Sequence, residues 1–386
     1  MAITGRQIQG EGSIYQRPDG RWCGMVDLGY VNGKRRRKAV FGKTEREVSA
    51  KLKPLLADQQ RGLAIPSGRQ TVEEYMDRWL ATVAKHRLAI STHEAYERNN
   101  RLHITPHIGR VQLAKLTPGH LSKLYTTLIE GGLSKRSAQY VHAILHTALK
   151  QAARERLIAR NPADDLDPPR PDTHDIAPLT PEQAAQFLRA IIADRLFALY
   201  LLAIATSLRQ GEILGLKWAD IDWERCTLLV VRKVSRTKST GLAFGDLKSR
   251  KGRRTLALPP VLLEVLRRHR TAQDEARLAA EGRWQDHDLI FPNGIGKPME
   301  RQNLVRRSFN GCLAQAGLPL MPFHTLRHSA ATLLIALQVH MKVVQQQLGH
   351  SAIATTMNIY GHVTEGMQRE VADKLEVYFR AALADE

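Results

Sequence analysis

The C-terminal half of the chain contains two arginines whose surroundings suit the transfer of a phosphoryl group. Arg209 lies in residues 206–212, Thr-Ser-Leu-Arg-Gln-Gly-Glu, and Arg327 lies in residues 324–328, His-Thr-Leu-Arg-His. Negative charge spreads over the phosphate oxygens during such a reaction, so the site needs cationic hydrogen-bond donors. Arginine meets this need because its planar fork binds two oxygens at once and stays charged at every working pH.

A nucleophile and proton-carrying groups follow the second arginine. The segment Leu-Gly-His ends at His350, and Tyr360 lies ten residues beyond it. A phenol must lose a proton to attack a phosphate, and the departing sugar oxygen must gain one, so a base and an acid are also required. Histidines and a lysine can serve in these roles. The sequence therefore contains the parts of a nucleophilic phosphoryl transfer.

Structural roles are the alternative for the individual residues. Arg209 and Glu212 are three residues apart, a spacing that places two side chains on one helix face, and such a pair is often a plain salt bridge. Zinc binding is the alternative for the histidines. However, the sequence has no pair of cysteines at ligand spacing and no His-Glu-x-x-His motif, so we expect no metal site and no cofactor.

Taken together, the order of these motifs resembles the tyrosine recombinase family, which includes the phage integrases. The likeness covers residues from about 180 to 363. Family members usually have glycine where Ser207 stands, a difference that leaves the neighbouring arginine in place. The resemblance implies a site-specific DNA recombinase that cleaves and rejoins DNA through a 3′-phosphotyrosyl intermediate. Such an enzyme would integrate and excise a phage or another mobile element.

The resemblance also implies a role for each residue of the site. The two arginines would bind the scissile phosphate while the tyrosine attacks it. His324 would assist removal of the tyrosine proton, His350 would donate a hydrogen bond to the phosphate, and Glu212 would orient the first arginine. The residues implied to be catalytic are Arg209, Lys248, His324, Arg327, His350 and Tyr360.

The general acid implied by the resemblance is a lysine in a β-hairpin. Here the hairpin corresponds to residues 245–255. Matching the strand that follows favours Lys248, and Lys251 is the competing choice because loops vary in length. His328 and His362 have no implied role, and we expect them to be structural or solvated.

Two other functions are weighed against an integrase. A topoisomerase with the same chemistry would relax supercoils without exchanging strands, and the three-part layout of the chain argues against it. A catalytically inactive DNA-binding regulator would keep the fold and lose the chemistry. A protein that only binds DNA has no use for a nucleophile, so the complete catalytic set argues against this function too.

The overall charge indicates a polyanionic partner. The 386 residues include 57 Lys and Arg against 38 Asp and Glu, which gives a formal net charge of +19 and a pI near 10.1. Nucleic acid fits this balance best. The longest apolar run, residues 196–205, is about half of the ~20 residues that span a bilayer, so it predicts a buried helix and no membrane association.

The N-terminus and the cysteines indicate the cellular setting. The first residues contain no apolar stretch of the signal-peptide type. The three cysteines, Cys23, Cys226 and Cys312, are scattered and odd in number. We therefore expect a reduced, cytoplasmic protein.

The elements that must position the site fall into three predicted domains. We assign residues 1–62 to an N-terminal arm-type DNA-binding domain, 69–162 to a helical core-binding domain and 175–386 to the catalytic domain. The fold class is multidomain α+β: a small three-stranded sheet with one helix, an all-helical domain, and a mainly helical catalytic domain with a small β-sheet. A proline-rich boundary at 163–178 separates the last two.

Short apolar runs predict the N-terminal sheet. Strands are expected around Ile14, at 22–28 and at 36–41, and Thr44 with Glu47 makes a capping box for a helix. Because a basic ribbon can enter a major groove, we expect DNA contacts from the third strand, with a solvated charge run as the alternative. The basic residues concerned are Lys34, Arg35, Arg36, Arg37 and Lys38.

Capping signals predict the helices of the second domain. Capping boxes at Thr71 and Ser91 begin two of them, and further helices are expected at 118–129 and 134–155. Basic side chains on this domain would bind DNA phosphates. These residues are Arg98, Arg101, Lys135 and Arg136.

In the third domain the pattern predicts mainly helices. The expected elements are a capped helix from Thr180, strands at 226–233 and 254–258, and helices at 260–281 and 324–337. After the tyrosine, apolar residues recur every four positions from 371 to 383. This stripe would dock a helix on a neighbouring subunit or on its own domain.

The resemblance implies partners as well. They are double-stranded DNA with core-type and arm-type attachment sites, and three further copies of the chain in a homotetramer on that DNA. A DNA-bending host factor and an excision directionality factor are expected to influence the direction of the reaction.

Overall fold

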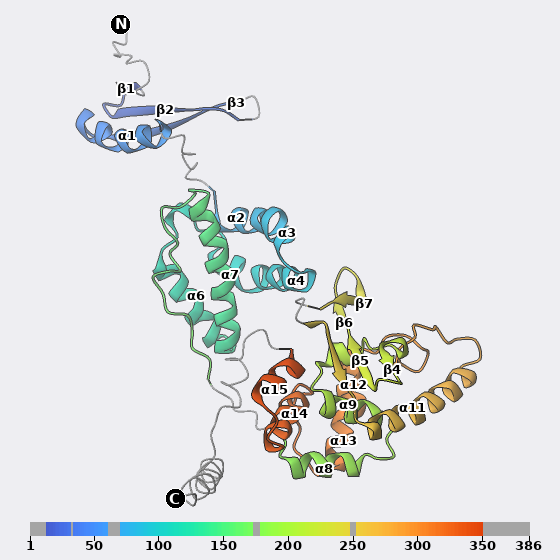
Figure 1. Cartoon of the computed structure of the whole chain (residues 1–386). Helices are drawn as coiled ribbons and strands as arrows, with labels where there is room; N and C mark the ends of the chain where they lie inside the picture. Colours follow the sequence, from blue (N-terminus) through green and yellow to red (C-terminus); the bar gives the residue numbers. More distant parts are fainter. Residues whose placement is uncertain (1–12, 32–33, 61–69, 173–177, 248–251, 350–386) are drawn as a thin grey trace, which may run out of the picture. The chain divides into compact units, whose positions relative to one another are not determined.

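The computed structural model describes residues 13–31, 34–60, 70–172, 178–247 and 252–349 (Figure 1). The chain divides into two compact units with the boundary between residues 173 and 174. That boundary lies inside the proline-rich segment identified in the sequence. The limits of the three predicted domains stay predictions. Among the described residues, no helix combines the length and the apolar character that a membrane span requires.

Three antiparallel strands and one helix form near the N-terminus, where the sequence predicts them. The strands pair in the order β1-β2-β3, and the helix packs against them. Gly24 allows this close packing, because a Cβ there would lie 2.7 Å from a methyl carbon of Val48. Thr44 caps the helix by accepting the backbone N–H of Glu47 at 3.2 Å. The elements are β1 (Ser13–Gln16), β2 (Trp22–Val31), β3 (Lys34–Gly42) and α1 (Glu45–Gln60).

Residues 70–172 form mainly helices, two of which continue through a π-turn. The capping box at Thr71 is present. The predicted cap at Ser91 is wrong, because α4 already begins at Ile90, after the extended Ala89. The elements are α2 (Val72–Trp79), η1 (Leu80–Ala84), α3 (Lys85–Arg87), α4 (Ile90–Asn99), η2 (Asn100–Ile104), α5 (Thr105–Ile108), η3 (Leu113–Lys115), α6 (Pro118–Glu130) and α7 (Lys135–Arg154).

The C-terminal unit is mostly helical and contains two small sheets. The apolar run at 196–205 is buried in α9, as predicted, and α9 packs against α11 and α14. Thr180 caps α8 as expected. The helices are α8 (Pro181–Ala190), α9 (Phe197–Thr206), α10 (Gln210–Ile213), η4 (Trp218–Asp220), α11 (Pro260–Ala279), α12 (Arg301–Leu304), η6 (Val305–Phe309), α13 (Asn310–Gln315), α14 (Thr325–Ala336) and α15 (Met341–Leu348).

The strands of this unit correct the hairpin expected at 245–255. The strands are β4 (Ile221–Asp222), β5 (Thr227–Val230), β6 (Arg232–Thr237), β7 (Gly241–Asp246) and β8 (Arg254–Ala257). β7 pairs with β6, and β8 pairs with β5 in the order β4-β5-β8. The expected hairpin is therefore wrong: its two arms belong to different sheets. The prediction also treated 226–233 as one strand, whereas β5 and β6 are separate strands in this stretch (Figure 1).

Ser207 makes the turn between α9 and α10 that leads to Arg209. It is fully buried and has a left-handed backbone, with φ 55° and ψ 24°. Glycine adopts this conformation without the steric cost that a Cβ brings. In the described part of the chain, the Ser207 hydroxyl oxygen has no hydrogen-bond partner. Both features indicate that glycine would fit this position with less strain than serine.

Replacement Ser207→Gly should raise the free energy of unfolding by about 1 kcal/mol or more, because it removes the strained Cβ and the buried unpaired hydroxyl. Ser207→Ala is the matched control, since it removes the hydroxyl and keeps the strain. Urea denaturation should place the glycine variant above the alanine variant. A glycine variant less stable than the native protein would contradict this account of the turn.

Candidate active site

Arg209 stands at the start of the short helix α10. Its backbone is extended, with φ −71° and ψ 145°, so it precedes the helix as its N-cap instead of lying within it. The helix packs closely on β6 because Gly211 has no side chain; a Cβ there would lie 2.8 Å from the carbonyl oxygen of Val234. The arginine side chain is 44% exposed and can reach a ligand in solvent.

Glu212 holds Arg209 in this position. Arg209 Nη1 donates to Glu212 Oε1 at 2.9 Å, and the Arg209 backbone N–H donates to Oε2 at 3.1 Å. The glutamate side chain is 4% exposed. The two side chains that the sequence spacing predicts to meet therefore do meet, with the buried carboxylate behind the exposed guanidinium.

Arg327 joins segments that are far apart in the sequence. It is only 3% exposed, although arginine is among the residues that are rarely buried. Its Nη1 donates to the carbonyl of Ser207 at 2.7 Å, and its Nη2 donates to the carbonyl of Leu348. Ser207 lies two residues before Arg209, and Leu348 lies two residues before His350. One side chain thus brings three of the sequence motifs together.

His324 lies at the N-terminal end of α14, beside these arginines. The residue is exposed on one side, and partial desolvation, followed by the neighbouring charges of His328, Arg327, Arg209 and Arg301, lowers its pKa to about 4. The ring is therefore neutral at physiological pH and has a nitrogen that can accept a proton. His328, which had no predicted role, packs edge-on against it, with ring centroids 4.9 Å apart and planes at 90°.

Several predicted site residues lie outside the described part of the chain. They are Lys248, Lys251, His350 and Tyr360. The structure does describe the residues that flank them, namely Leu247, Gly252 and Gly349. Leu247 and Gly252 lie close together, since a Cβ on the glycine would be 3.1 Å from Cβ of Leu247. Gly349, just before His350, ends α15 with a left-handed backbone.

One buried residue of the site was missed by the sequence analysis. Arg254, at the start of β8, donates from Nη2 to Glu212 Oε2 at 3.0 Å. A signal was present in the alternating pattern of the strand, because Arg254 falls on the same face as the buried Leu256. Its neighbour Arg253 is 62% exposed and pairs loosely with Asp246.

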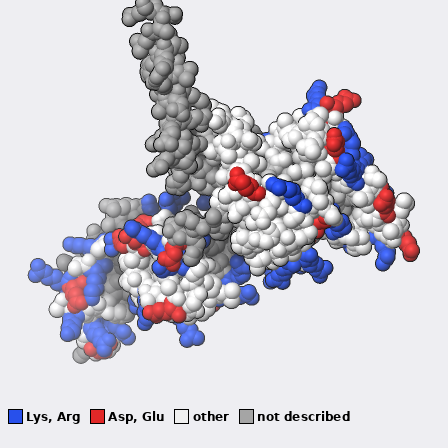
Figure 2. Space-filling view, turned by 90° about the horizontal axis from the view of Figure 1, so that it is seen from below, with Lys and Arg blue, Asp and Glu red and all other residues white. Residues whose placement is uncertain are grey.

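The basic residues predicted to grip DNA are on the protein surface in residues 70–172. Arg98, Arg101, Lys135 and Arg136 are all exposed. Lys135 forms an ion pair with Asp172 at 2.8 Å, so part of the positive charge of Lys135 is already neutralised. In the face drawn in Figure 2, Lys and Arg side chains are spread widely with fewer Asp and Glu among them.

Two aromatic residues connect the helices that carry this basic surface. Tyr96 on α4 packs edge-on against Tyr140 on α7, with ring centroids 5.9 Å apart. Tyr140 is 39% exposed and lies near Arg98. In the N-terminal sheet, Arg37 on β3 is exposed, and the side chains of Lys34, Arg35, Arg36 and Lys38 lie outside the described residues.

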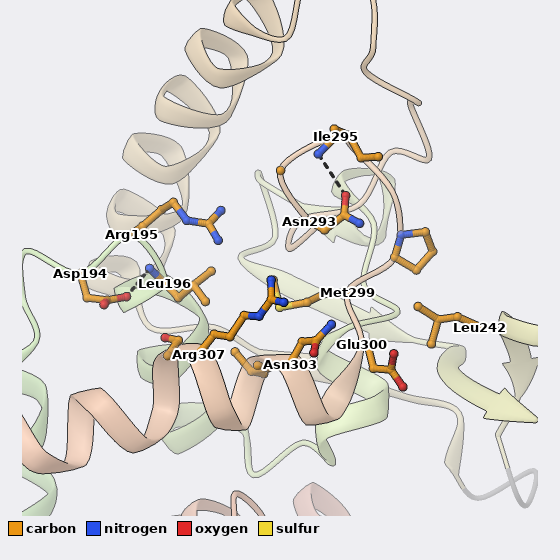
Figure 3. Close-up of a pocket in the computed structure, with 14 residues that line it drawn as sticks. Asp194, Arg195, Leu196, Leu242, Asn293, Ile295, Met299, Glu300, Asn303 and Arg307 are labelled. Atoms are coloured by element: carbon orange, nitrogen blue, oxygen red, sulfur yellow. Dashed lines mark hydrogen bonds between the residues drawn. The ribbon is translucent and has the colours of Figure 1, made fainter.

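A cavity of about 600 Å³ lies beside α12 (Figure 3). Arg195 and Arg307 extend into it, and Asn293 and Asn303 line it. Arg209, His324 and Arg327 do not line this cavity. Within the described ranges, no group of three or more His, Cys, Asp or Glu side chains is arranged to hold a metal ion.

Comparison with known proteins gives matches along most of the chain. Residues 178–367 match the family described as the phage integrase family, and residues 71–129 match the phage integrase N-terminal SAM-like domain. An integrase from Streptomyces ambofaciens is 32% identical over 378 residues, which cover 92% of this chain and 93% of that protein. A protein named tyrosine recombinase XerC-like, from Caldanaerobacter subterraneus, is 30% identical, covering 90% of this chain and 93% of its own.

The fold is also similar to that of solved structures. The Tn1549 transposon integrase, in complex with a circular intermediate DNA, superposes with a TM-score of 0.67 and 21% identity. The match covers 79% of this chain and 99% of that one. At this level of identity the likeness concerns the fold alone.

The low pKa of His324 predicts a pH effect on stability. In the unfolded chain a histidine titrates near pH 6.5, and in the folded protein His324 titrates at about 4. Between these values the unfolded chain binds more protons, so the free energy of unfolding falls as the pH falls from 6.5 to 4. His324→Gln should lose less stability over this range than the native protein. Urea denaturation at pH 7.5 and pH 5 measures the difference, and equal losses would contradict the prediction.

Proposed function

The chain belongs to the phage integrase family of tyrosine recombinases, and we propose that it recombines DNA by attack of the Tyr360 hydroxyl on a phosphodiester. The protein is a site-specific recombinase. One observation supports the proposed site above all others: the buried Arg327 bonds to the segments that carry Arg209 and lead to His350. Residues up to 120 positions apart thus meet at one place.

In the proposed reaction, Arg209 and Arg327 stabilise the negative charge on the scissile phosphate, and His350 adds a hydrogen bond. Arg209 and Arg327 are held by hydrogen bonds within the protein, and donors fixed before the reaction offset the developing charge without a costly rearrangement. Glu212 fixes the orientation of the exposed Arg209 guanidinium. The neutral ring of His324 assists removal of the Tyr360 proton.

The attack forms a bond between the tyrosine oxygen and phosphorus and breaks the bond to the 5′ oxygen of the next nucleotide. The enzyme then holds a 3′-phosphotyrosyl ester, and the departing oxygen receives a proton from Lys248 or Lys251. The strand is rejoined when a 5′-hydroxyl of the partner duplex attacks this ester. The ester keeps the energy of the original bond, so the strand is rejoined without an energy-rich cofactor, and the two arginines supply the positive charge that metal ions supply in other enzymes.

We assign the remaining parts of the chain to DNA binding. The exposed arginines of residues 70–172 would bind phosphates around a core-type site, and the N-terminal sheet would bind an arm-type site. Exchange between two duplexes cuts four strands, and each chain contains one Tyr360, so the reaction requires four copies on the DNA. A DNA-bending host factor and a directionality factor would bias the enzyme towards integration or excision of its mobile element.

The nucleophile is tested by trapping the protein on a nicked duplex that cannot religate, with a sequence taken from DNA flanking the gene. The native protein should form a covalent adduct, and Tyr360→Phe should form none while binding the duplex with similar affinity, because only the nucleophilic oxygen is lost. Electrophoresis under denaturing conditions detects the adduct. Tight binding by the native protein without any adduct would favour a DNA-binding regulator.

The general acid is tested with Lys248→Ala and Lys251→Ala, each the control of the other. Loss of the acid should slow adduct formation by about 10²-fold or more. Replacing the 5′ bridging oxygen with sulfur should restore the rate in that variant alone, because a thiolate leaves without a proton. If the sulfur substrate rescues Lys251→Ala alone, Lys251 is the general acid. If it rescues neither variant, neither lysine is the general acid.

A further inference from the structure

Arg254 carries a buried charge and has no role in the proposed cleavage reaction. It opens β8, and its side chain is 8% exposed. An ionised guanidinium is costly to bury unless its donors find acceptors. The identity of those acceptors therefore indicates what the residue does.

Each of the three guanidinium nitrogens has a partner. Nη2 donates to Oε2 of Glu212 at 3.0 Å, Nε donates to the carbonyl of Gln347 at 3.0 Å, and Nη1 donates to the carbonyl of Gly252 at 2.9 Å. One side chain thus connects the carboxylate behind Arg209 with the end of α15 and the start of β8.

Glu212 is shared between two arginines. Its Oε1 accepts from the Arg209 guanidinium, and its Oε2 accepts from Arg254 and from the Arg209 backbone N–H. Burial alone would raise the pKa of Glu212, but the charge of Arg254, followed by the hydrogen bonds from Arg209, holds this pKa below its ordinary value. The carboxylate is therefore ionised, and Arg254 occupies the oxygen that could otherwise take a second bond from the Arg209 side chain.

The bond to Gln347 holds the turn that leads towards His350. A hollow of about 590 Å³ is lined by β8 on one side and α15 on the other, so the Arg254 bond joins elements that are partly separated. Gly349 packs on the same guanidinium: its φ is +63°, and a Cβ there would lie 3.1 Å from Nη1 of Arg254. A side chain at position 349 would strain the turn and displace the arginine.

We propose that Arg254 is a positioning residue for strand cleavage, which holds Arg209 in place through Glu212 and fixes the turn ahead of His350. The inference rests on the proposed roles of these residues at the scissile phosphate. Without Arg254, only the Arg209 backbone N–H holds Oε2 of Glu212, so the carboxylate can turn towards the Arg209 guanidinium and draw it away from the phosphate. A displacement of about 1 Å costs about 10²-fold in rate.

The test measures single-turnover adduct formation by the full-length protein at saturating concentration. The probe is the nicked duplex used for Tyr360, prepared with a normal phosphate or with a methylphosphonate at the scissile position. A methylphosphonate lacks one charged oxygen, so it depends less on correctly placed arginines. The variants are Arg254→Met, which removes the charge, and Arg254→Lys, which keeps the charge but cannot make the three bonds.

Arg254→Met should slow cleavage of the phosphate by about 100-fold and of the methylphosphonate by about 10-fold or less, while the Kd for the duplex changes by less than about twofold. Arg254→Lys should recover part of the rate. The lysine variant also provides the test on its own if the methionine variant fails to fold. Arg232→Met is the matched control, because it breaks another ion pair of this unit, in which Arg232 is partly buried and Asp220 is buried. It should slow both duplexes by the same factor.

Two results would overturn the proposal. One is an unchanged rate in both Arg254 variants, and the other is an equal loss on the two duplexes, as expected from a general loss of stability. Both leave the recombinase function intact, because the native protein still forms its adduct. If the native protein forms no adduct at all, the proposed function fails and this inference fails with it.

Discussion

A charge buried inside a protein must be matched by hydrogen-bond acceptors, and the candidate site is organised around this requirement. The Arg327 guanidinium is matched by backbone carbonyls, one at the turn after α9 and one at the end of α15. Backbone carbonyls cannot move without moving their segments, so the turn before Arg209 and the turn before His350 are both tied to one side chain. Any shift of α14 is then passed to both segments at once.

The site residue Arg209 caps the start of a short helix, α10, which these hydrogen bonds help to position. α10 has four residues, too few to be stable alone, and it is held from outside by its contact with β6 at Gly211 and by the ion pairs of Glu212. The advantage of such an arrangement is that Arg209 stands at a helix start, where its side chain reaches solvent while its backbone stays fixed. The cost is dependence on distant partners, of which the strand β8 is one.

The sequence predicts the local contacts of the candidate site better than its distant supports. The contact between Arg209 and Glu212 could be predicted because residue type and spacing along one helix turn are local properties. The partner of β8 was predicted wrongly, since a strand pattern shows that a strand forms and not which strand it pairs with; β5 lies more than twenty residues earlier. Arg254 was missed because a charged residue beside Arg253 suggests a surface position, and only its alternation with Leu256 indicates burial. The cap at Ser91 failed because two start points compete within three residues.

The distribution of charge around Glu212 has a consequence for the protein before it meets DNA. Arg209 and Arg254 share this one carboxylate, so two cations face a single anion when no phosphate is bound. Like charges held close together raise the energy of the native fold, and a bound phosphodiester removes that excess. Folding and substrate binding are thereby thermodynamically linked: the C-terminal unit gains stability from its substrate, and added salt weakens this gain by screening the attraction.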